Sequence, residues 1–153
     1  MLKLLVDYPD WEDELKILEA NANVSVMHEV NPVVDAETIF RSRKLIDGIY
    51  LDDKLKSYLV DVVLATRDPS QCGASELAAF IRFGASPRAT ISLALASKAV
   101  AFMHGRSFVT PQDIKDVGLD VLRHRVIISY EAEAENVTSD DIIKKIFETV
   151  PVP

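Results

Sequence analysis

Apolar positions recur at three- and four-residue intervals through most of the chain, which is the spacing of one face of an α-helix. Each such stretch follows an Asp, Ser or Thr that can cap the first turn of a helix. The predicted helices cover approximately residues 11–20, 36–46, 53–67, 87–104, 111–123 and 139–149. Because no strands alternate with these helices, the pattern predicts a mainly α fold.

Only short segments favour strands. The apolar run Leu2–Val6 is too brief for a helix and Pro9 follows it closely, so we expect a short strand there. β-Prone residues also occupy positions 24–27 and 126–130, and the second of these segments predicts an edge strand or an extended arm. The irregular stretch 70–84 predicts a loop and a short helix.

The stretch 87–104 is the most apolar of the predicted helices, so we expect it to be covered on most sides. The helices at 53–67 and 111–123 are expected to pack against it, and the first two helices to form a separate flap. The predicted division therefore separates residues 1–50, with the strand and the flap, from residues 51–153, with the central bundle.

The run Gly84-Ala85-Ser86-Pro87-Arg88-Ala89-Thr90 marks the start of the central helix. Ser86 is expected to cap it through the hydroxyl, and Pro87 suits the first helical position because proline has no N–H to lose. Arg88 then falls in the first turn, where the helix dipole is positive, and this placement costs roughly 0.3–1 kcal/mol unless an anion is nearby. The sequence therefore predicts a negative group beside Arg88.

Helical periodicity places Arg88 on the apolar side of this helix. At about 100° per residue, this side carries Ile91, Leu95, Ala99 and Phe102. The opposite side, expected to face water, carries Thr90, Ala94, Ser97, Lys98, Ala101 and His104. An arginine so placed can extend into water, pair with a carboxylate of a neighbouring helix, or bind a phosphate through its planar fork. These alternatives stay open here, although free N–H groups at the helix start also favour a phosphate.

Composition and charge exclude several function classes. The chain has 153 residues, of which 48% are hydrophobic, and a formal net charge of −7. This length supports a folded core, and the negative charge argues against a sequence-independent grip on nucleic acid. The single cysteine, Cys72, excludes an internal disulfide. Since no signal peptide and no long apolar run is present, we expect a cytoplasmic protein without membrane contact.

Common catalytic motifs are missing. No glycine is followed by lysine, so the phosphate loop of P-loop proteins is absent, as is a glycine-rich dinucleotide fingerprint. His28, His104 and His124 lie far apart and without metal-binding spacing, so no metal site is predicted. We therefore expect no catalysis by this chain alone.

Two groups of cations have simple structural explanations. The cluster Arg41, Arg43 and Lys44 is expected to decorate a solvated helix face, with a buried ion pair as the alternative for Arg43, which falls nearer the apolar side. The run Arg123-His124-Arg125 ends a predicted helix, where positive charge suits the dipole. A contact with a partner is the alternative for this second group.

Several blocks stand out along the chain, at residues 3–9 (KLLVDYP), 65–67 (ATR), 84–89 (GASPRA), 105–114 (GRSFVTPQDI), 124–126 (HRV) and 150–153 (VPVP). In this order and spacing they resemble the C-terminal portion of MoxR-type AAA+ ATPases. The resemblance spans nearly the whole chain, and Ser107 departs from it because the family often has a tyrosine there.

The resemblance implies a helical AAA+ lid bundle with a short N-terminal strand and inserted helices, separated from an ATPase core upstream. The arginine matching Arg88 is the sensor 2 residue of that family, which contacts the γ-phosphate of ATP, in related clades on the neighbouring subunit. Ser86 and Arg67 are possible supporting residues. ATP and Mg²⁺ would then belong to the full-length parent, and neither is expected on this fragment.

The resemblance also implies partners. These are the upstream AAA+ core, neighbouring subunits of a ring, and a protein with a von Willebrand A domain, in chaperone-like assembly or cofactor insertion. The alternative is a freestanding acidic helical protein-interaction module without a nucleotide role. Because the phosphate would come from elsewhere, we expect Arg88 to be exposed or loosely paired in this chain.

Overall fold

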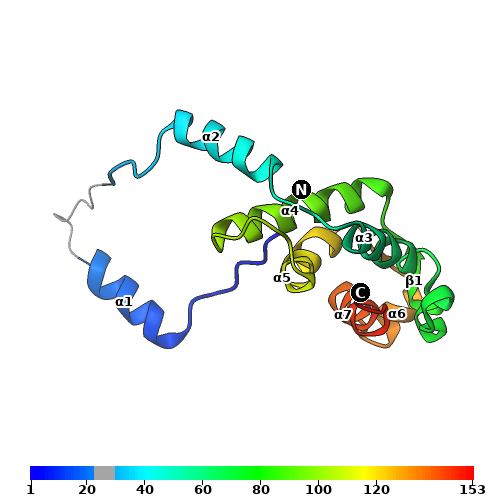
Figure 1. Cartoon of the computed structure of the whole chain (residues 1–153). Coiled ribbons are helices and arrows are strands. Elements are labelled where there is room, and N and C mark those ends of the chain that lie inside the picture. Colours follow the sequence, from blue (N-terminus) through cyan, green and yellow to red (C-terminus); the bar gives the residue numbers. More distant parts are fainter. Residues whose placement is uncertain (23–29) are drawn as a thin grey trace.

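The computed structural model describes residues 1–22 and 30–153, and it is mainly α-helical as predicted (Figure 1). The expected β-like segment at 24–27 lies outside the described residues. The helices are α1 (Trp11–Asn21), α2 (Ala36–Asp47), α3 (Asp53–Ala65), α4 (Pro87–Met103), α5 (Pro111–Leu122), α6 (Tyr130–Ala134) and α7 (Ser139–Thr149). The 3-10 helices are η1 (Pro69–Cys72) and η2 (Ser75–Phe80), and the strands are β1 (Ile81–Phe83) and β2 (Ile127–Ile128).

Side-chain caps fix the start of most long helices. Asp10, Asp35 and Asp52 each accept a hydrogen bond from a backbone N–H in the first turn, at 2.9, 2.7 and 2.8 Å. Thr110 and Thr138 form capping boxes. In each, the threonine hydroxyl accepts a hydrogen bond from the backbone N–H of the N3 aspartate, and the aspartate carboxylate accepts one from the backbone N–H of the threonine. These helix starts confirm the predictions from the sequence.

Ser86 is the exception among the predicted caps. Its backbone has the extended conformation of an N-cap and its carbonyl accepts a hydrogen bond from Ala89 N at 2.8 Å, but its side chain makes no capping hydrogen bond. The expected role of the hydroxyl was therefore wrong. Ser86 is exposed, so water can serve the free N–H groups instead.

Helix α4 lies at the centre of the bundle and contacts both α3 and α5, as predicted (Figure 1). Helix α7 closes the bundle by packing on α5 and α3. The buried side chains come from all four helices and include Leu59, Val62, Leu93, Ile114, Val121, Ile142 and Ile146.

The covered face of α4 differs from the predicted one. The buried residues are Ala89, Leu93, Ala96, Ser97 and Ala101, so part of the side expected to be wet is in the core. Small side chains on this face let the neighbouring helices approach, and the Ser97 hydroxyl is satisfied because it donates to the Leu93 carbonyl at 2.8 Å. Helical periodicity therefore located the apolar stripe of α4, but not the side of this helix that packs into the core.

The apolar stripe that carries Arg88 is exposed near the start of α4 and partly buried near its end. Ile91 and Leu95 on this stripe are 61% and 42% exposed, whereas Phe102 is partly buried against the core. The half of the stripe nearest to Arg88 is therefore apolar and exposed.

The stretch after α3 is only partly as predicted. Instead of a loop and one short helix, the chain forms η1, η2 and then β1. Strand β1 pairs antiparallel with β2, with Ile81 opposite Ile128 and Phe83 opposite Ile127. Of the two alternatives expected at 126–130, the edge strand is confirmed at Ile127–Ile128, while Tyr130 already begins α6 and the partner strand was not anticipated.

Residues 1–47, which we refer to as the arm, bury none of their described side chains. The predicted strand at Leu2–Val6 is wrong, because this segment pairs with no strand among the described residues. Its start is held by a hydrogen bond from Lys3 N to the Asp120 carbonyl at 2.8 Å. Figure 1 shows α1 well apart from the other helices.

Residues 48–153, which we refer to as the body, contain the whole core. The end of α2 touches the body where Lys98 Nζ donates to the Asp47 carbonyl at 3.0 Å. Tyr50 then forms an isolated parallel bridge with Phe108. None of the described helices is both long and apolar enough to cross a membrane.

Candidate functional site

The turn before α4 is fixed to the end of α3. Thr66 Oγ1 accepts a hydrogen bond from Ala85 N at 2.9 Å, and Arg67 Nε donates to the Ala85 carbonyl at 2.7 Å. Gly84 is required here, because a Cβ at this position would lie 2.3 Å from the Thr66 carbonyl oxygen. Thr66 and Arg67, which directly follow α3, therefore bind the N–H and the carbonyl of Ala85 and fix the position of the first turn of α4.

Arg88 projects from this first turn and is exposed, as expected. Within residues 1–22 and 30–153 it makes no hydrogen bond or ion pair, so the structural ion pair with a neighbouring helix does not form there. It lines a surface hollow together with Met1, Ile91, Ser92 and Arg125. Arg88 thus shares this hollow with a second guanidinium, that of Arg125, and none of the residues that line the hollow carries a carboxylate.

The structure places the two supporting candidates at the same end of α4. Arg67 reaches this end through its hydrogen bond to Ala85, and Ser86 is exposed at the cap position. Neither of them lines the hollow that contains Arg88. The sequence therefore located the region, and the structure gives Arg67 a positioning contact in it.

Arg125 is the residue at this site that sequence reasoning did not assign to it. It follows α5, and its side chain reaches across to α4, where Nη2 lies 3.3 Å from Ser92 Oγ. The signals in the sequence were its places in the block His124-Arg125-Val126 and in the run Arg123-His124-Arg125, and neither carries information about its distance to Arg88.

The surroundings of Arg125 are positively charged. Burial lowers the pKa of the neighbouring His124, and the positive charges of Arg125 and Lys3 lower it further. The end of α5 and the start of the arm therefore form a cationic region in a chain whose formal net charge is −7.

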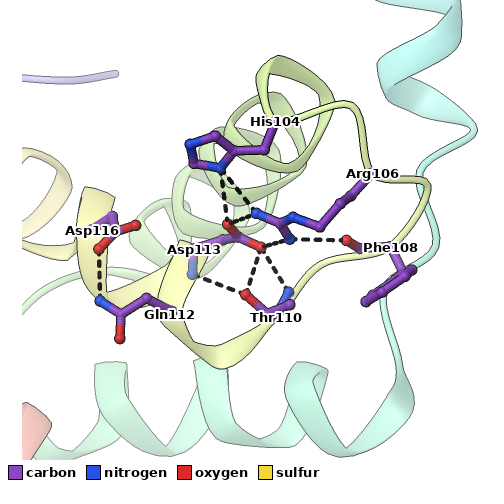
Figure 2. A network of polar contacts seen from close by, with 7 residues as sticks. All are labelled: His104, Arg106, Phe108, Thr110, Gln112, Asp113 and Asp116. Atoms are coloured by element: carbon purple, nitrogen blue, oxygen red, sulfur yellow. Dashed lines mark hydrogen bonds and ion pairs between the residues drawn. The ribbon is translucent and has the colours of Figure 1, made fainter.

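A second polar network lies at the other end of α4 (Figure 2). Arg106 binds Asp113 in a bidentate pair, with Nη1 2.7 Å from Oδ2 and Nη2 2.6 Å from Oδ1. Asp113 also accepts from the backbone and hydroxyl of Thr110 at 2.7 and 2.9 Å. His104 adds a contact from its Nδ1 to Arg106 Nη2 at 2.9 Å.

This network is a structural tie between α4 and α5. Burial alone would raise the pKa of Asp113, but the hydrogen bonds from Arg106 and Thr110 outweigh it and lower the pKa from 3.8 to about 2. The carboxylate is 1% exposed and every interaction serves its charged form. The capping box was visible in the sequence, whereas the pairing with Arg106 was not.

No metal centre is built by the part of the chain that the structure describes. In residues 1–22 and 30–153, no group of three or more His, Cys, Asp or Glu side chains is arranged to hold a metal ion. The described histidines, His104 and His124, lie in the two separate regions above.

Comparison with known proteins identifies the fold. Residues 74–146 match the family model of the AAA lid domain. A crystal structure of a candidate ATPase from Cytophaga hutchinsonii superposes with a TM-score of 0.94 at 36% identity, over 100% of this chain and 46% of that one. The class of protein is therefore an AAA lid domain.

Relatives with curated names identify the family. Chaperone MoxR1 of Mycobacterium tuberculosis is 31% identical over 153 residues, which cover 100% of this chain and 40% of MoxR1. Protein MoxR of Paracoccus denitrificans is 35% identical over 112 residues, 69% of this chain and 33% of that protein. The chain belongs to the MoxR family of AAA+ proteins, of which it holds the lid region, and it spans less than half the length of these relatives.

Proposed function

We propose that this chain is the nucleotide-sensing lid of a MoxR-type AAA+ ATPase and that Arg88 is its sensor 2 residue. The observation that carries the proposal is the position of Arg88, exposed in the first turn of α4 and without a partner among the described residues. The free N–H groups of the same turn and the helix dipole add to its attraction for a phosphate.

The chemistry that Arg88 would supply is electrostatic. In the loose transition state of phosphoryl transfer, charge is spread over the oxygens of the transferred group, and a guanidinium stabilises it. ATP and Mg²⁺ would be held by the ATPase core of the parent protein, in the same or the neighbouring subunit. The described part of this chain offers no metal site, so we assign the ion to the core.

The proposal extends to organisation and partners. The boundary near residue 50, with the lid domain after it, is supported by the change from exposed to buried side chains at Ile49. The relative named as a chaperone supports a role in chaperone-like assembly within a ring of subunits. Cofactor insertion and a partner with a von Willebrand A domain are proposed from the family resemblance, and a cytoplasmic location stays the expectation from the sequence.

Substitution of Arg88 in the full-length protein tests this function. Arg88→Ala is expected to lower kcat for ATP hydrolysis by roughly 10²-fold or more, since a transition-state cation is lost, while the melting temperature stays unchanged. Arg82→Ala is the matched control, because Arg82 is also exposed but does not line the hollow. Its guanidinium carbon lies 5.4 Å from the centre of the Phe83 ring. Unchanged turnover in Arg88→Ala would remove the sensor role.

A freestanding acidic interaction module is the second candidate. The net charge of −7 and the uncovered Ile91 and Leu95 favour it. Under this alternative, Arg88→Ala leaves ATP turnover of any longer form intact. ATP turnover by this chain alone, with Mg²⁺ present, would contradict both candidates.

A further inference from the structure

Arg125 is held in place by acceptors from three different segments. Nε donates to the Val121 carbonyl of α5 at 2.9 Å, and Nη2 donates to Ser92 Oγ of α4 at 3.3 Å and to the Met1 carbonyl at 3.4 Å. The side chain is half-buried. Its guanidinium is therefore oriented before any ligand arrives, and this lowers the entropy cost of binding.

The same contacts bring Arg125 close to Arg88. Ser92 lies four residues after Arg88 on α4, so the two side chains are neighbours on one face, about one helical turn apart. Arg125 contacts Ser92 and lines the same hollow as Arg88. Two guanidinium groups from different helices thus border one surface depression.

The Asp120 carboxylate of α5 is engaged in an ion pair. It pairs with Arg123 at 3.3 Å, and Arg123 also pairs with Asp140 at 3.1 Å. None of the residues that line the hollow is acidic. Since like charges repel, two arginines beside one hollow favour an anion that carries several charges between them.

We propose that Arg125 is a second phosphate-binding residue of the Arg88 site and that both arginines bind the same oligophosphate. The ligand class is the triphosphate of a nucleotide, for which a free oligophosphate is a chemical equivalent. The inference rests on the proposed function and deepens it, because it assigns a residue outside α4 to the recognition of that phosphate.

Inorganic triphosphate titrated into this chain at low ionic strength tests the proposal. The arginine Nε–H signals are followed by NMR, and those of Arg88 and Arg125 are expected to shift together and to saturate. Arg88→Ala and Arg125→Gln are each expected to weaken binding roughly fivefold or more, which corresponds to about 1 kcal/mol. Arg125→Lys, which keeps the charge, should recover part of the loss.

Controls separate phosphate binding from general charge and from folding. Arg82→Gln removes an exposed charge elsewhere and is expected to leave affinity within about twofold. Arg125→Gln can still donate a hydrogen bond near Ser92, and its melting temperature is measured alongside. If Arg125→Gln does not fold, Arg125→Lys and Ser92→Ala replace it, together with the wild-type shifts of the Arg125 signal.

The outcomes distinguish this inference from the function on which it rests. If Arg88→Ala weakens binding and Arg125→Gln does not, the assignment of Arg125 is wrong and the sensor role of Arg88 stands. If Arg82→Gln weakens binding equally, or the wild-type chain shows no saturable shift, the shared site is overturned. Lost turnover in full-length Arg88→Ala would uphold the proposed function in each of these cases.

Two further titrations identify the source of the phosphate. Equal affinity for ATP and inorganic triphosphate, with no shift on addition of adenosine, would support recognition of the phosphate chain alone. Tighter binding of ATP, with the same dependence on Arg88 and Arg125, would support a nucleotide whose base or sugar adds contacts. ATP binding that is insensitive to both arginines would overturn the proposal.

Discussion

Helices α1 and α7 have the same length, 11 residues, and the same kind of beginning, yet they differ completely in burial. Each has a capping side chain that accepts a backbone hydrogen bond and acidic residues in its first turn. Helix α7 buries Ile142, Ile143, Ile146 and Phe147, whereas α1 buries none of its residues. The local sequence therefore specifies that a segment is helical, but a neighbouring surface decides whether its apolar side is covered.

The same difference separates the arm from the body. In the arm, large apolar side chains are exposed throughout, among them Leu4, Val6, Trp11, Leu18 and Phe40. The crystal structure from Cytophaga hutchinsonii matches this chain over its full length, arm included, within a chain more than twice as long. The matched region therefore includes the arm, although the body alone contains the core of this chain.

Truncation of a central side chain gives the largest expected effect. Leu93 is 0% exposed, so Leu93→Ala should destabilise the body by about 2–5 kcal/mol through lost burial and a cavity. Leu18→Ala in the arm, where Leu18 is 60% exposed, should change the free energy of unfolding by less than about 0.5 kcal/mol. Urea unfolding followed by circular dichroism measures both, and equal losses would contradict the contrast.

Addition of a methyl group gives the next largest effect. In Gly84→Ala the new Cβ meets the Thr66 backbone, which cannot rotate away, so we expect a loss of about 1–3 kcal/mol. Gly48→Ala, at the junction with the arm, meets no atom closer than 3.4 Å and has a helical backbone, so stability should stay equal or rise slightly. Thermal unfolding of the two variants compares them, and a stable Gly84→Ala would mean that the α3–α4 contact is loose.

Asp113 connects stability of the body to pH. Its folded pKa of about 2 lies below the ordinary value of 3.8, so it contributes stability that is present above about pH 4 and is lost as the pH falls through 2. Asp113→Asn should therefore cost about 2 kcal/mol at neutral pH, and the difference from wild type should shrink between pH 4 and 2. Denaturant midpoints across this range measure it.

Asp35→Asn is the matched control in the arm. Hydrogen bonds from Thr38 lower the pKa of Asp35, but α2 buries no residue and asparagine caps helices nearly as well as aspartate. The unfolding midpoint of the body is expected to be unchanged by this substitution at every pH. A pH-independent loss in Asp113→Asn would contradict the role assigned to the charged form.

The smallest expected effect uses the single tryptophan as a reporter of the arm. Trp11 is 76% exposed, so its fluorescence should resemble that of tryptophan in water and change little across the unfolding transition of the body. Far-ultraviolet circular dichroism should show that transition clearly. A strongly blue-shifted emission that reverts on unfolding would show that α1 packs on the body in solution.

The sequence predicted most helices because their signals are local. Caps such as Asp52 and Thr138 act within one turn and need no knowledge of the rest of the chain. The strand at Leu2–Val6 failed because a strand needs a partner, and the described chain provides none there. The covered face of α4 was missed because Ala and Ser read as weakly polar in a periodicity pattern, although they suit close helix contacts.

The candidate site likewise contains residues that local sequence patterns identify and residues that only the tertiary structure brings to it. Arg88 was found from the order of cap, proline and cation, which is a local pattern. Arg125 and the Arg106–Asp113 pair depend on how α5 returns beside α4, and one sequence does not give that geometry. The residue types of the site can therefore be identified from the sequence, but the side chains that lie next to one another in the folded chain cannot.

The two hydrogen bonds that hold Ala85 have a mechanical consequence. The Thr66 hydroxyl accepts from the Ala85 N–H and the Arg67 side chain donates to the Ala85 carbonyl, while Gly84 lets the backbone pass in close contact with Thr66. The first turn of α4, which carries Arg88, is therefore coupled to the end of α3, and a displacement of one is expected to move the other.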